Sequence, residues 1–589
     1  MPAPKGQKIA PGISEAELAA EKERLAREKW LVVVSDNGDE LRGAPSNLRS
    51  NQGFMLECLA MKDQALAAMN HLMPALSENQ AFLRAARRTI ADRYRSLRAI
   101  EKDDQKYQTL PNCGSMNIAL EDGFTRLLEA DYVISQADQD IKLKDYSSLP
   151  ETGAFYVGPI WQQKIASEAP EAFGLQKKCN AGVLVVALSY LWAGADAPDD
   201  PQNQQLHEVA SFLRFLKGCF EYRHFRVVLF WDWASTMQGN PERTEAQNDM
   251  LLDGDLWFTH PSILTLQNKR LPEGRKESWS YERSGWPMYE DGVGRLVKPR
   301  EKVLDLQVVL NWLSSEDADA DYHPDPKQQK PPFCDAEGLP VKKRNSFAAM
   351  VAACVPLDRR RLPLAPKQFG SRTKRAHFGR ESDRKLVQKK YADAFLSTLG
   401  RAKQLTHFEK MGKATDEEAF EARNHEWRAF VEHALPRCKG GLVELSFAGN
   451  GELLIDLAEI LKVLPPTLEV LRLNRTACFG DGTKQEWKHL TRLELVDVER
   501  SGVKGTMEDI QHAIFKSRQG VVEDPKPCEV VTTLRLSHLC KACALCCANR
   551  CCRFFWLCYL YPSGHTSRVL EESELVVNTG SAEFEASMM

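Results

Sequence analysis

Two short apolar runs, each ended by small and polar residues, dominate the hydrophobic pattern at the centre of the chain. They lie within 181–194 (AGVLVVALSYLWAG) and 224–238 (HFRVVLFWDWASTMQ). Runs rich in Val, Leu, Phe and Trp are typical of buried strands in a parallel sheet. Residues 202–220 place apolar side chains on one helical face, at Leu206, Val209, Phe212, Leu213 and Leu216. Strand, amphipathic helix and strand in this order predict a right-handed βαβ unit.

Polar and aromatic residues directly follow the two predicted strands, where α/β proteins place their binding sites. Ser189, Tyr190 and Trp192 follow the first strand, and Asp232 and Gln238 follow the second. Each has a structural alternative, because a hydroxyl can satisfy the backbone, a Trp can lie in the core and an Asp can cap a turn. We treat all five as candidate site residues.

A later stretch, YERSGWPMYEDGVG from Tyr281, supplies two more candidates. Ser284 and Pro287 are helix start signals, so Glu290 is expected in the first turn of a helix. Trp286 stands four residues before Glu290. The alternative is that Glu290 only interacts favourably with the helix dipole.

The segments before the central region are predicted to be mostly helical. We expect a mobile lead-in over 1–45 with a short helix around 15–29, a helical region over 46–150 and the α/β domain over 151–313. In 51–102, apolar residues spaced by three and four predict a helical hairpin with a basic, solvated outer face.

The composition changes abruptly after Leu313. Residues 314–390 are charged, contain prolines and are predicted to be a linker, followed by a helical segment over 391–438. The strongly basic stretch 342–403 lacks the regular aromatic interleaving that would suggest base stacking. A solvated basic helix is therefore expected there, and nucleic-acid binding is not.

A weak repeat occupies 439–540. LVELSFAGN begins at Leu442, LEVLRLNRT at Leu468, LTRLELVDV at Leu490 and a degenerate copy, VTTLRLSHL, at Val531. The L-x-x-L-x-L core, recurring about every two dozen residues, is the leucine-rich-repeat signature. The copies predict a short arc of stacked units. Its role is either binding a protein partner or capping the structure.

Three motifs of the central region resemble those of the heterokaryon-incompatibility domain, a family of self/non-self response proteins with a TIR-like fold. Val186–Gly194 (VALSYLWAG) resembles the first motif, Leu229–Gln238 (LFWDWASTMQ) the second and Arg283–Glu290 (RSGWPMYE) the third. In the second motif, Ser235 stands where the family usually has Cys and Met237 where it has Asp or Asn. The resemblance covers about a fifth of the chain.

The resemblance implies a fold and a chemistry. In TIR enzymes that cleave NAD, a Glu a few residues after a Trp or Cys, on a helix beside the pocket, is essential, and Trp286 and Glu290 match that spacing. A carboxylate stabilises the oxocarbenium-like cation that forms when the nicotinamide–ribose bond breaks. The resemblance thus implies catalytic roles for Glu290 and Asp232. The residues it implies for binding NAD as substrate are Ser189, Tyr190, Trp192, Gln238 and Trp286.

The order of the parts also resembles that of uncharacterised multidomain protist proteins with degenerate leucine-rich repeats. The expected fold is a TIR-like α/β parallel-sheet domain flanked by an α-helical N-terminal region and a short C-terminal leucine-rich-repeat arc. One hypothesis is an intracellular signalling or self-defence protein whose α/β domain is an interaction module, able to form homo-oligomers, with a protein-binding repeat arc. The other is an NAD-cleaving hydrolase. The altered second motif favours the interaction module.

Bulk composition narrows these hypotheses only slightly. The 589 residues are too many for one core, and a net charge of −3 gives no global attraction to nucleic acid or to anionic membranes. The N-terminus lacks the apolar core of a signal peptide, so a cytoplasmic location is expected. The sequence G-x-x-x-x-G-K-[ST] of a phosphate-binding loop is absent.

The 16 cysteines fall into two groups. Eight are scattered between Cys58 and Cys478, as buried thiols of a reduced compartment would be. The others cluster in 528–558, and 541–589 is predicted to be a Cys-rich tail. Three alternatives stay open for this tail: a zinc site, S-acylation with anchoring at a membrane surface, or an irregular tail without a dedicated role. The candidate zinc ligands are Cys540, Cys543, Cys546 and Cys551.

Overall fold

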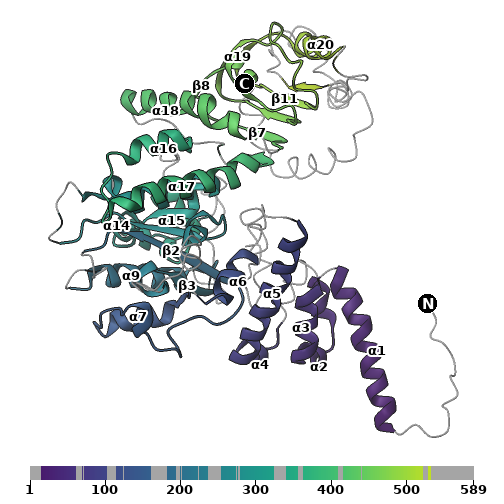
Figure 1. Cartoon of the computed structure of the whole chain (residues 1–589), viewed down its shortest axis with the longest axis vertical. Helices are drawn as coiled ribbons and strands as arrows, with labels where there is room; N and C mark the ends of the chain where they lie inside the picture. The colour runs from purple at the N-terminus through teal and green to yellow at the C-terminus, as the bar shows by residue number, and fades with distance from the viewer. Residues whose placement is uncertain are drawn as a thin grey trace, which may run out of the picture. The chain divides into compact units, whose positions relative to one another are not determined.

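A computed structural model describes residues 15–36, 38–61, 69, 72–101, 114–123, 125–160, 182–193, 199, 202–222, 225–236, 254–273, 275, 279–323, 340–355, 362–406, 408, 416–438, 441–519, 521 and 528–531. The chain divides into two units, Met1–Val531 and Thr532–Met589. The second unit, with Cys540, Cys543, Cys546 and Cys551, lies outside the described residues. The described part combines helices with parallel sheets and is of the α/β class (Figure 1).

A five-stranded sheet forms the centre of the first unit. Its order is β1 (Leu128–Glu129), β3 (Arg226–Phe230), β2 (Val183–Tyr190), β4 (Leu264–Asn268) and β5 (Val303–Asp305). β1 pairs antiparallel with β3, and the other pairs are parallel. The chain therefore runs from β2 to one side, into β3, and then crosses to the other side of β2, into β4.

The predicted βαβ unit is confirmed. β2 leads through α9 (Gln204–Gly218) into β3, and the two strands pair in parallel with Val185 opposite Val228. All five apolar positions predicted for the inner face of α9 are buried. Every residue of β2 is buried, as expected for a central strand covered on both faces.

Alternation along β2 divides the core into two layers. Val185 packs into one buried cluster and Val186 into the other. Because successive side chains of a strand point to opposite faces, Ser189 faces the layer of Val185, whereas Tyr190 packs in the layer of Val186. The two neighbouring candidates thus lie on different faces of the sheet.

Helices cover both faces. The layer of Val186 includes side chains of α9, α7 (Ala130–Asp138), α14 (Leu306–Leu313) and α15 (Phe347–Cys354). The layer of Val185 includes side chains of α12 (Gly254–Thr259) and α13 (Gly285–Val297). Since β1 and α7 belong to the sheet domain, this domain starts before residue 151, earlier than the boundary predicted from sequence.

Helices precede the sheet, as predicted. Their bounds are α1 (Glu15–Asp36), η1 (Gly38–Gly43), α2 (Ser46–Arg49), α3 (Gln52–Met61), α4 (Pro74–Ser77), α5 (Gln80–Glu101) and α6 (Gly114–Glu121). α1 is longer than the short helix expected around 15–29, and Val34 near its end is buried. The basic face of α5 is partly neutralised, because Arg87 and Arg88 both pair with Glu121 of α6.

The segment predicted to be a linker, 314–390, contains packed helices. Phe347 and Met350 of α15 are buried in the sheet domain. α16 (Pro366–Thr373) and α17 (Glu381–Ser397) follow, and α18 (Glu417–Ala429) continues into a π-helical turn at Phe430–Ala434. The linker prediction relied on charge and proline content, which do not reveal the buried apolar side chains of these short helices.

The described residues of 441–531, the repeat region, form stacked parallel coils. Its first sheet has the order β13 (Glu529–Val531), β11 (Leu495–Asp497), β9 (Val470–Arg472), β7 (Glu444–Ser446) and β6 (Gln404–Leu405). All its strand pairs are parallel. A second parallel sheet and two helices complete the coils, namely β12 (Gly502–Lys504), β10 (Ala477–Asp481), β8 (Leu454–Asp456), α19 (Leu457–Val463) and α20 (Met507–Arg518).

Strand pairing corrects the predicted register of two repeats. Leu445, Leu471 and Val496 are aligned neighbours and fully buried. The third copy therefore begins at Leu493, three residues after the start predicted from sequence. The fourth strand buries Val530, so it lies just before the copy expected from Val531, most of which is outside the described residues.

In this register, one polar side chain closes each coil after its strand. Asn450 Nδ2 donates to Phe447 O at 2.7 Å, Thr476 Oγ1 to Leu473 O at 2.5 Å and Ser501 Oγ to Val498 O at 2.6 Å, the three acceptors being equivalent backbone carbonyls. The residue before each of these has a positive φ, at Gly449, Arg475 and Arg500. Each coil thus turns through a left-handed residue stabilised by the side chain that follows.

Replacing Arg475 with Gly is expected to stabilise the repeat region by about 0.5–1 kcal/mol. A left-handed conformation costs a non-glycine residue about 1–2 kcal/mol, which outweighs the entropy that a glycine loses on folding. Arg475 is exposed, so little packing is lost. The measurement is hydrogen exchange of the repeat-region amides. Arg492→Gly, at an exposed position without a positive φ, should instead accelerate exchange.

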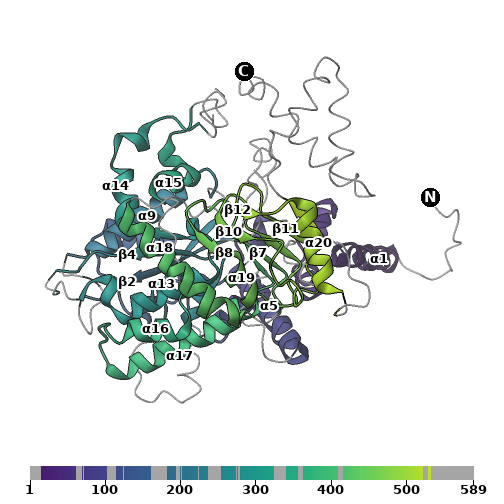
Figure 2. The same cartoon turned by 90° about the horizontal axis from the view of Figure 1, so that it is seen from above.

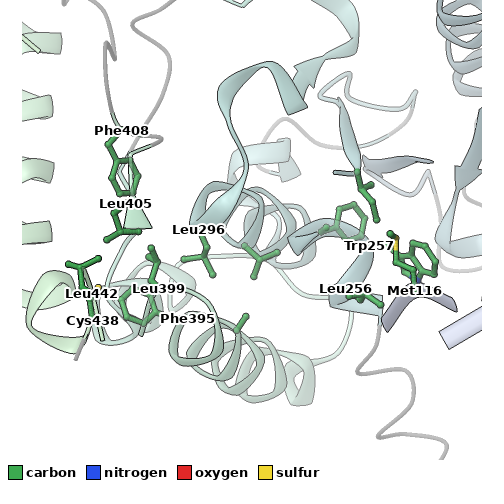
Figure 3. Close-up of a cluster of buried hydrophobic side chains, with 14 of the residues drawn as sticks. Met116, Leu256, Trp257, Leu296, Phe395, Leu399, Leu405, Phe408, Cys438 and Leu442 are labelled. Carbon is green, nitrogen blue, oxygen red and sulfur yellow. The ribbon is translucent and has the colours of Figure 1, made fainter. Parts of the chain in front are cut away.

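One continuous apolar cluster joins the sheet domain to the repeat region (Figure 3). It includes Trp257 of α12, Leu296 of α13, Phe395 of α17 and Leu442 at the start of the first coil. Trp257 is fully buried and its ring stacks on Phe230 at a centroid distance of 5.5 Å. The helix α13, which carries Glu290, therefore packs on the sheet on one side and on the segment leading to the repeats on the other.

Candidate functional site

Ser189, Tyr281 and Glu290 form a hydrogen-bonded group at the carboxyl end of β2. Ser189 is fully buried, and its Oγ donates to Glu290 Oε2 at 2.5 Å. Ser189 Oγ also lies 2.5 Å from the hydroxyl of Tyr281, which belongs to η7 (Tyr281–Arg283). When Glu290 is ionised it can only accept, so Ser189 gives its one proton to Glu290 and Tyr281 donates to Ser189. In that state the hydrogen bonds run in one direction, from Tyr281 through Ser189 to Glu290.

A second group forms around Asp232, the first residue of α10 (Asp232–Ser235) after β3. The Tyr190 hydroxyl donates to Asp232 Oδ1 at 2.7 Å, and the Trp233 backbone N–H donates to the same oxygen at 2.6 Å. The Trp192 indole also hydrogen-bonds to Asp232 and packs edge-to-face on Trp233 at a centroid distance of 5.5 Å. Asp232, Tyr190 and Trp192 are thus brought together as candidates.

Both groups lie at the position where α/β sheets most often bind ligands. The chain leaves β2 towards β3 on one side and returns to β4 on the other, so the carboxyl end of β2 is a topological switch point. Glu290 approaches this point from α13 on one face, and Asp232 approaches it from the end of β3. The loop residues 194–198 and 237–253, which follow β2 and α10, lie outside the described residues, and Gln238 is among them.

The environment of Glu290 favours its protonated form. Burial raises the pKa of Glu290 well above its usual value and the charge of Asp232 adds to this, while the hydrogen bond from Ser189 acts in the opposite direction. Burial also raises the pKa of Asp232, against hydrogen bonds from Tyr190, Trp233 and Trp192. A cation placed between these carboxyl groups would favour their ionised forms.

The adjacent carboxylate, Asp291, is in a different environment. Arg295 donates to Asp291 at 2.6 Å, and Gln267 at the end of β4 donates to it at 2.9 Å. Burial opposes ionisation, but the charge and hydrogen bond of Arg295 and the bond from Gln267 together lower the pKa of Asp291. Among the described residues, Glu290 has no such ion pair with Lys or Arg. Asp291 is therefore held by an ion pair, whereas Glu290 is held by the hydrogen bond from Ser189.

Close packing fixes where α13 begins. The Gly285 N–H donates to His377 O at 2.8 Å, and a Cβ on Gly285 would lie 2.0 Å from the Phe378 ring. Only glycine fits this contact. Because the helix starts at Gly285, Glu290 lies in its second turn, so the prediction of a first-turn Glu was wrong, and the helix-dipole explanation for this residue falls with it.

Trp286 hydrogen-bonds outside the two groups around Glu290 and Asp232. Its indole donates to Asp383 Oδ2 of α17 at 3.1 Å, and Lys390 Nζ lies 5.9 Å from its ring centroid. Both contacts are therefore with α17, which packs on α13. A role for Trp286 in binding NAD stays a prediction.

Sequence reasoning missed three residues of the site region, Tyr281, Gln267 and Arg295. Tyr281 lies just before the third motif and could have been included with it. Gln267 is the penultimate residue of a strand, LTLQN at 264–268, whose short alternating pattern was not recognised. Arg295 stands four residues after Asp291, the spacing at which helical side chains pair, and that signal was available.

Two cavities of the described chain lie outside these groups. One, of about 30 Å³, lies between α13 and the α16–α18 segment and is lined by Asp291, Arg295 and Glu426 among others. The other, of about 340 Å³, is an open groove between α9 and α14 that includes His207 and Glu208. Within the described ranges, no group of three or more His, Cys, Asp or Glu side chains is placed to hold a metal ion. No described helix is long and apolar enough to cross a membrane.

Comparison of the chain with models of protein families, with curated proteins and with solved structures gives no match.

Proposed function

We propose that this chain is a signalling or self-defence protein whose TIR-like α/β domain hydrolyses the nicotinamide–ribose bond of NAD, with Glu290 as the catalytic carboxylate. The observation that carries the proposal is the Tyr281–Ser189–Glu290 hydrogen-bonded group at the switch point of the sheet. A Glu that served only the fold would be expected to pair with a cation, as the adjacent Asp291 does. The charge of Asp232, the second predicted catalytic carboxylate, raises the pKa of Glu290, so the two groups interact.

The proposed reaction breaks the C1′–N bond of the nicotinamide riboside, and the bonding electron pair leaves with nicotinamide. The ribose carbon becomes oxocarbenium-like, and water adds to it with release of a proton. Glu290 in its ionised form stabilises this cation, with Ser189 holding the carboxylate oxygen in place. The cationic nicotinamide ring favours ionisation of Glu290 on binding, and Trp192, partly exposed beside Asp232, is placed to stack on a ring.

The topology supports a TIR-like assignment. Numbered along the chain, the four parallel strands lie across the sheet in the order second, first, third and fourth, the arrangement of doubly wound sheets that bind nucleotides at the switch point. The repeat region supports the leucine-rich-repeat assignment through its corrected register. Its coils follow L-x-x-L-x-L-x-x-N, with Asn450, Thr476 and Ser501 at the last position.

The direct test is nicotinamide release from NAD by the full chain, measured at several protein concentrations because the domain is also expected to self-associate. A rate of nicotinamide release that rises in proportion to protein concentration supports the proposal. A rate that rises more steeply than in proportion also supports it and indicates that assembly is required. A folded chain that releases no nicotinamide at any concentration overturns it.

A second candidate function, protein interaction without catalysis, is favoured by the surface of the repeat region. Leu454 on β8 and Phe479 on β10 are 37% and 48% exposed, and strand pairing places them as diagonal neighbours on one face. Exposed apolar neighbours of this kind suit a protein partner. If a protein binds there, replacing Leu454 and Phe479 together with Ser should abolish its binding while leaving nicotinamide release unchanged.

Replacing Ser189 with Ala is expected to shift the pH profile of nicotinamide release to higher pH. The hydrogen bond from Ser189 favours the ionised form of Glu290, so its loss raises the pKa of this group further. The measurement is kcat/KM as a function of pH. Because activity needs the ionised carboxylate, the acid limb of this profile should move to higher pH. A matched control, Ser135→Ala on the surface of α7, should leave the profile in place. An unchanged profile for Ser189→Ala would contradict the proposed role.

The predicted zinc ligands Cys540, Cys543, Cys546 and Cys551, and the Cys-rich tail predicted to be S-acylated, lie outside the described residues. Both stay predictions, as does the cytoplasmic location.

A further inference from the structure

We propose that the basic hairpin, residues 366–390, is a binding surface for single-stranded nucleic acid. This segment comprises α16, the first part of α17 and the turn between them. It contains nine Lys or Arg and two Asp or Glu, a net charge of +7 in a chain whose total is −3. Positive charge of this density in one short segment attracts a polyanion through its phosphates.

The hairpin is a rigid support for these charges. α16 and α17 lie side by side in both views (Figures 1 and 2). The Phe369 ring stacks on Tyr391 at a centroid distance of 3.8 Å and an interplanar angle of 9°. Gln388 Nε2 donates to Thr373 Oγ1 at 2.8 Å and so ties α17 to the end of α16. The cationic side chains therefore project from a defined surface instead of a linker.

Most of the positive charges are available to a ligand. Six cations of the hairpin are exposed and form no ion pair among the described residues, namely Lys367, Lys374, Arg375, Arg380, Lys385 and Lys389. The two acidic residues of the hairpin already have partners. Glu381 pairs with Arg384, and Asp383 accepts the hydrogen bond of Trp286. Nothing within the hairpin competes with phosphate for the six cations.

Tertiary structure supplies the aromatic rings that the basic sequence lacks. Trp279, from a distant part of the chain, stacks on His377 of the hairpin at a centroid distance of 5.1 Å and an interplanar angle of 15°. The Arg275 guanidinium lies over the Trp279 ring, 5.0 Å from its centroid. The His377 N–H donates to Arg283 O at 2.7 Å, which fixes the stack beside the start of α13. Partly exposed stacked rings next to unpaired cations suit unstacked bases and their phosphates.

A membrane surface fits the hairpin less well. Peripheral membrane helices bury a continuous apolar face among the lipids. Leu386, which is 38% exposed, is the hairpin's one exposed large apolar side chain, and the whole hairpin is described. The charges thus lack the apolar anchor that a membrane-binding helix needs, while the Trp279–His377 stack matches nucleic acid.

The test is binding of fluorescently labelled oligouridine to the full chain, followed by anisotropy at increasing salt. The triple variant K374E/R375E/R380E is expected to weaken binding at least tenfold and to reduce the slope of log affinity against log salt by about 2, since each phosphate contact contributes about 0.7. The control triple K142E/K144E/R492E changes exposed residues by the same charge and should bind as the unaltered protein does. Trp279→Leu should weaken binding about tenfold with an unchanged salt slope.

Three outcomes would overturn the proposal. They are no binding of oligouridine by the unaltered chain, equal losses in the two triple variants, and binding to phosphatidylserine vesicles but not to oligouridine. Circular dichroism of each variant establishes that it is folded. The measurement does not depend on nicotinamide release, so an inactive α/β domain would leave this inference standing.

Discussion

Glu290→Gln is expected to lower nicotinamide release by at least about a thousandfold. An electrostatic group aimed at a developing charge is typically worth about 10²–10³ in rate, and a carboxylate that faces a full ribosyl cation lies at the upper end. Gln keeps the shape and can still accept the hydrogen bond from Ser189, so the charge alone is removed. The measurement is kcat for nicotinamide release at saturating NAD.

The same substitution should leave the protein at least as stable near neutral pH. Because the pKa of Glu290 is raised in the folded state, the unfolded chain loses this proton more readily, and stability falls as pH rises from the ordinary pKa of Glu through the raised one. Gln has no proton to lose and avoids this cost. The control is Glu282→Gln, at an exposed Glu of the preceding turn, which should be fully active. Full activity of Glu290→Gln would contradict the proposed mechanism.

Leu471→Ala is expected to destabilise the repeat region by about 2–5 kcal/mol. Leu471 is fully buried between Leu445 and Val496 of the adjacent coils, so its loss removes buried methyl groups and leaves a cavity that both neighbours line. In stacked repeats each coil is stabilised mainly by its neighbours, so loss in the middle coil weakens both interfaces.

The measurement is hydrogen exchange in the repeat region, because a chain of several cores need not unfold in one step. Leu454→Ala is the matched control, since Leu454 is in the same region but partly exposed, and it should change stability by less than about 0.5 kcal/mol. Equal effects of the two substitutions would show that Leu471 does not hold the coils together.

Strong local patterns predicted much of the fold. The apolar runs around Val185 and Val228 and the amphipathic stretch between them gave the βαβ unit, because a fully buried strand needs a continuous apolar sequence. The repeat strands were found from their leucines, but the register of the third was misjudged. In LTRLELVDV the residues Leu490 and Leu493 are both buried, so spacing alone could not distinguish them.

The site was predictable where residues follow a strand directly, and less so where distant segments meet. Ser189, Asp232 and Glu290 were all named from sequence, and the structure places them at one edge of the sheet. The hydrogen bond from Trp286 to Asp383 was not predicted, because Asp383 comes from α17, a segment that the sequence suggested was linker or solvated helix. Neither charge nor periodicity reveals that α17 packs on α13, since this contact depends on which helix faces are left uncovered by the sheet.

The left-handed turn that ends each coil allows the repeat region to evolve by gain or loss of whole units. Gly449, Arg475 and Arg500 mark equivalent points about 25 residues apart, and at each the next side chain hydrogen-bonds to the equivalent backbone carbonyl. A duplication or loss of one such unit would restore the same neighbours on either side. The repeat region can therefore lengthen, shorten and diversify by whole-unit steps without changing the hydrogen bonds at the carboxyl end of β2.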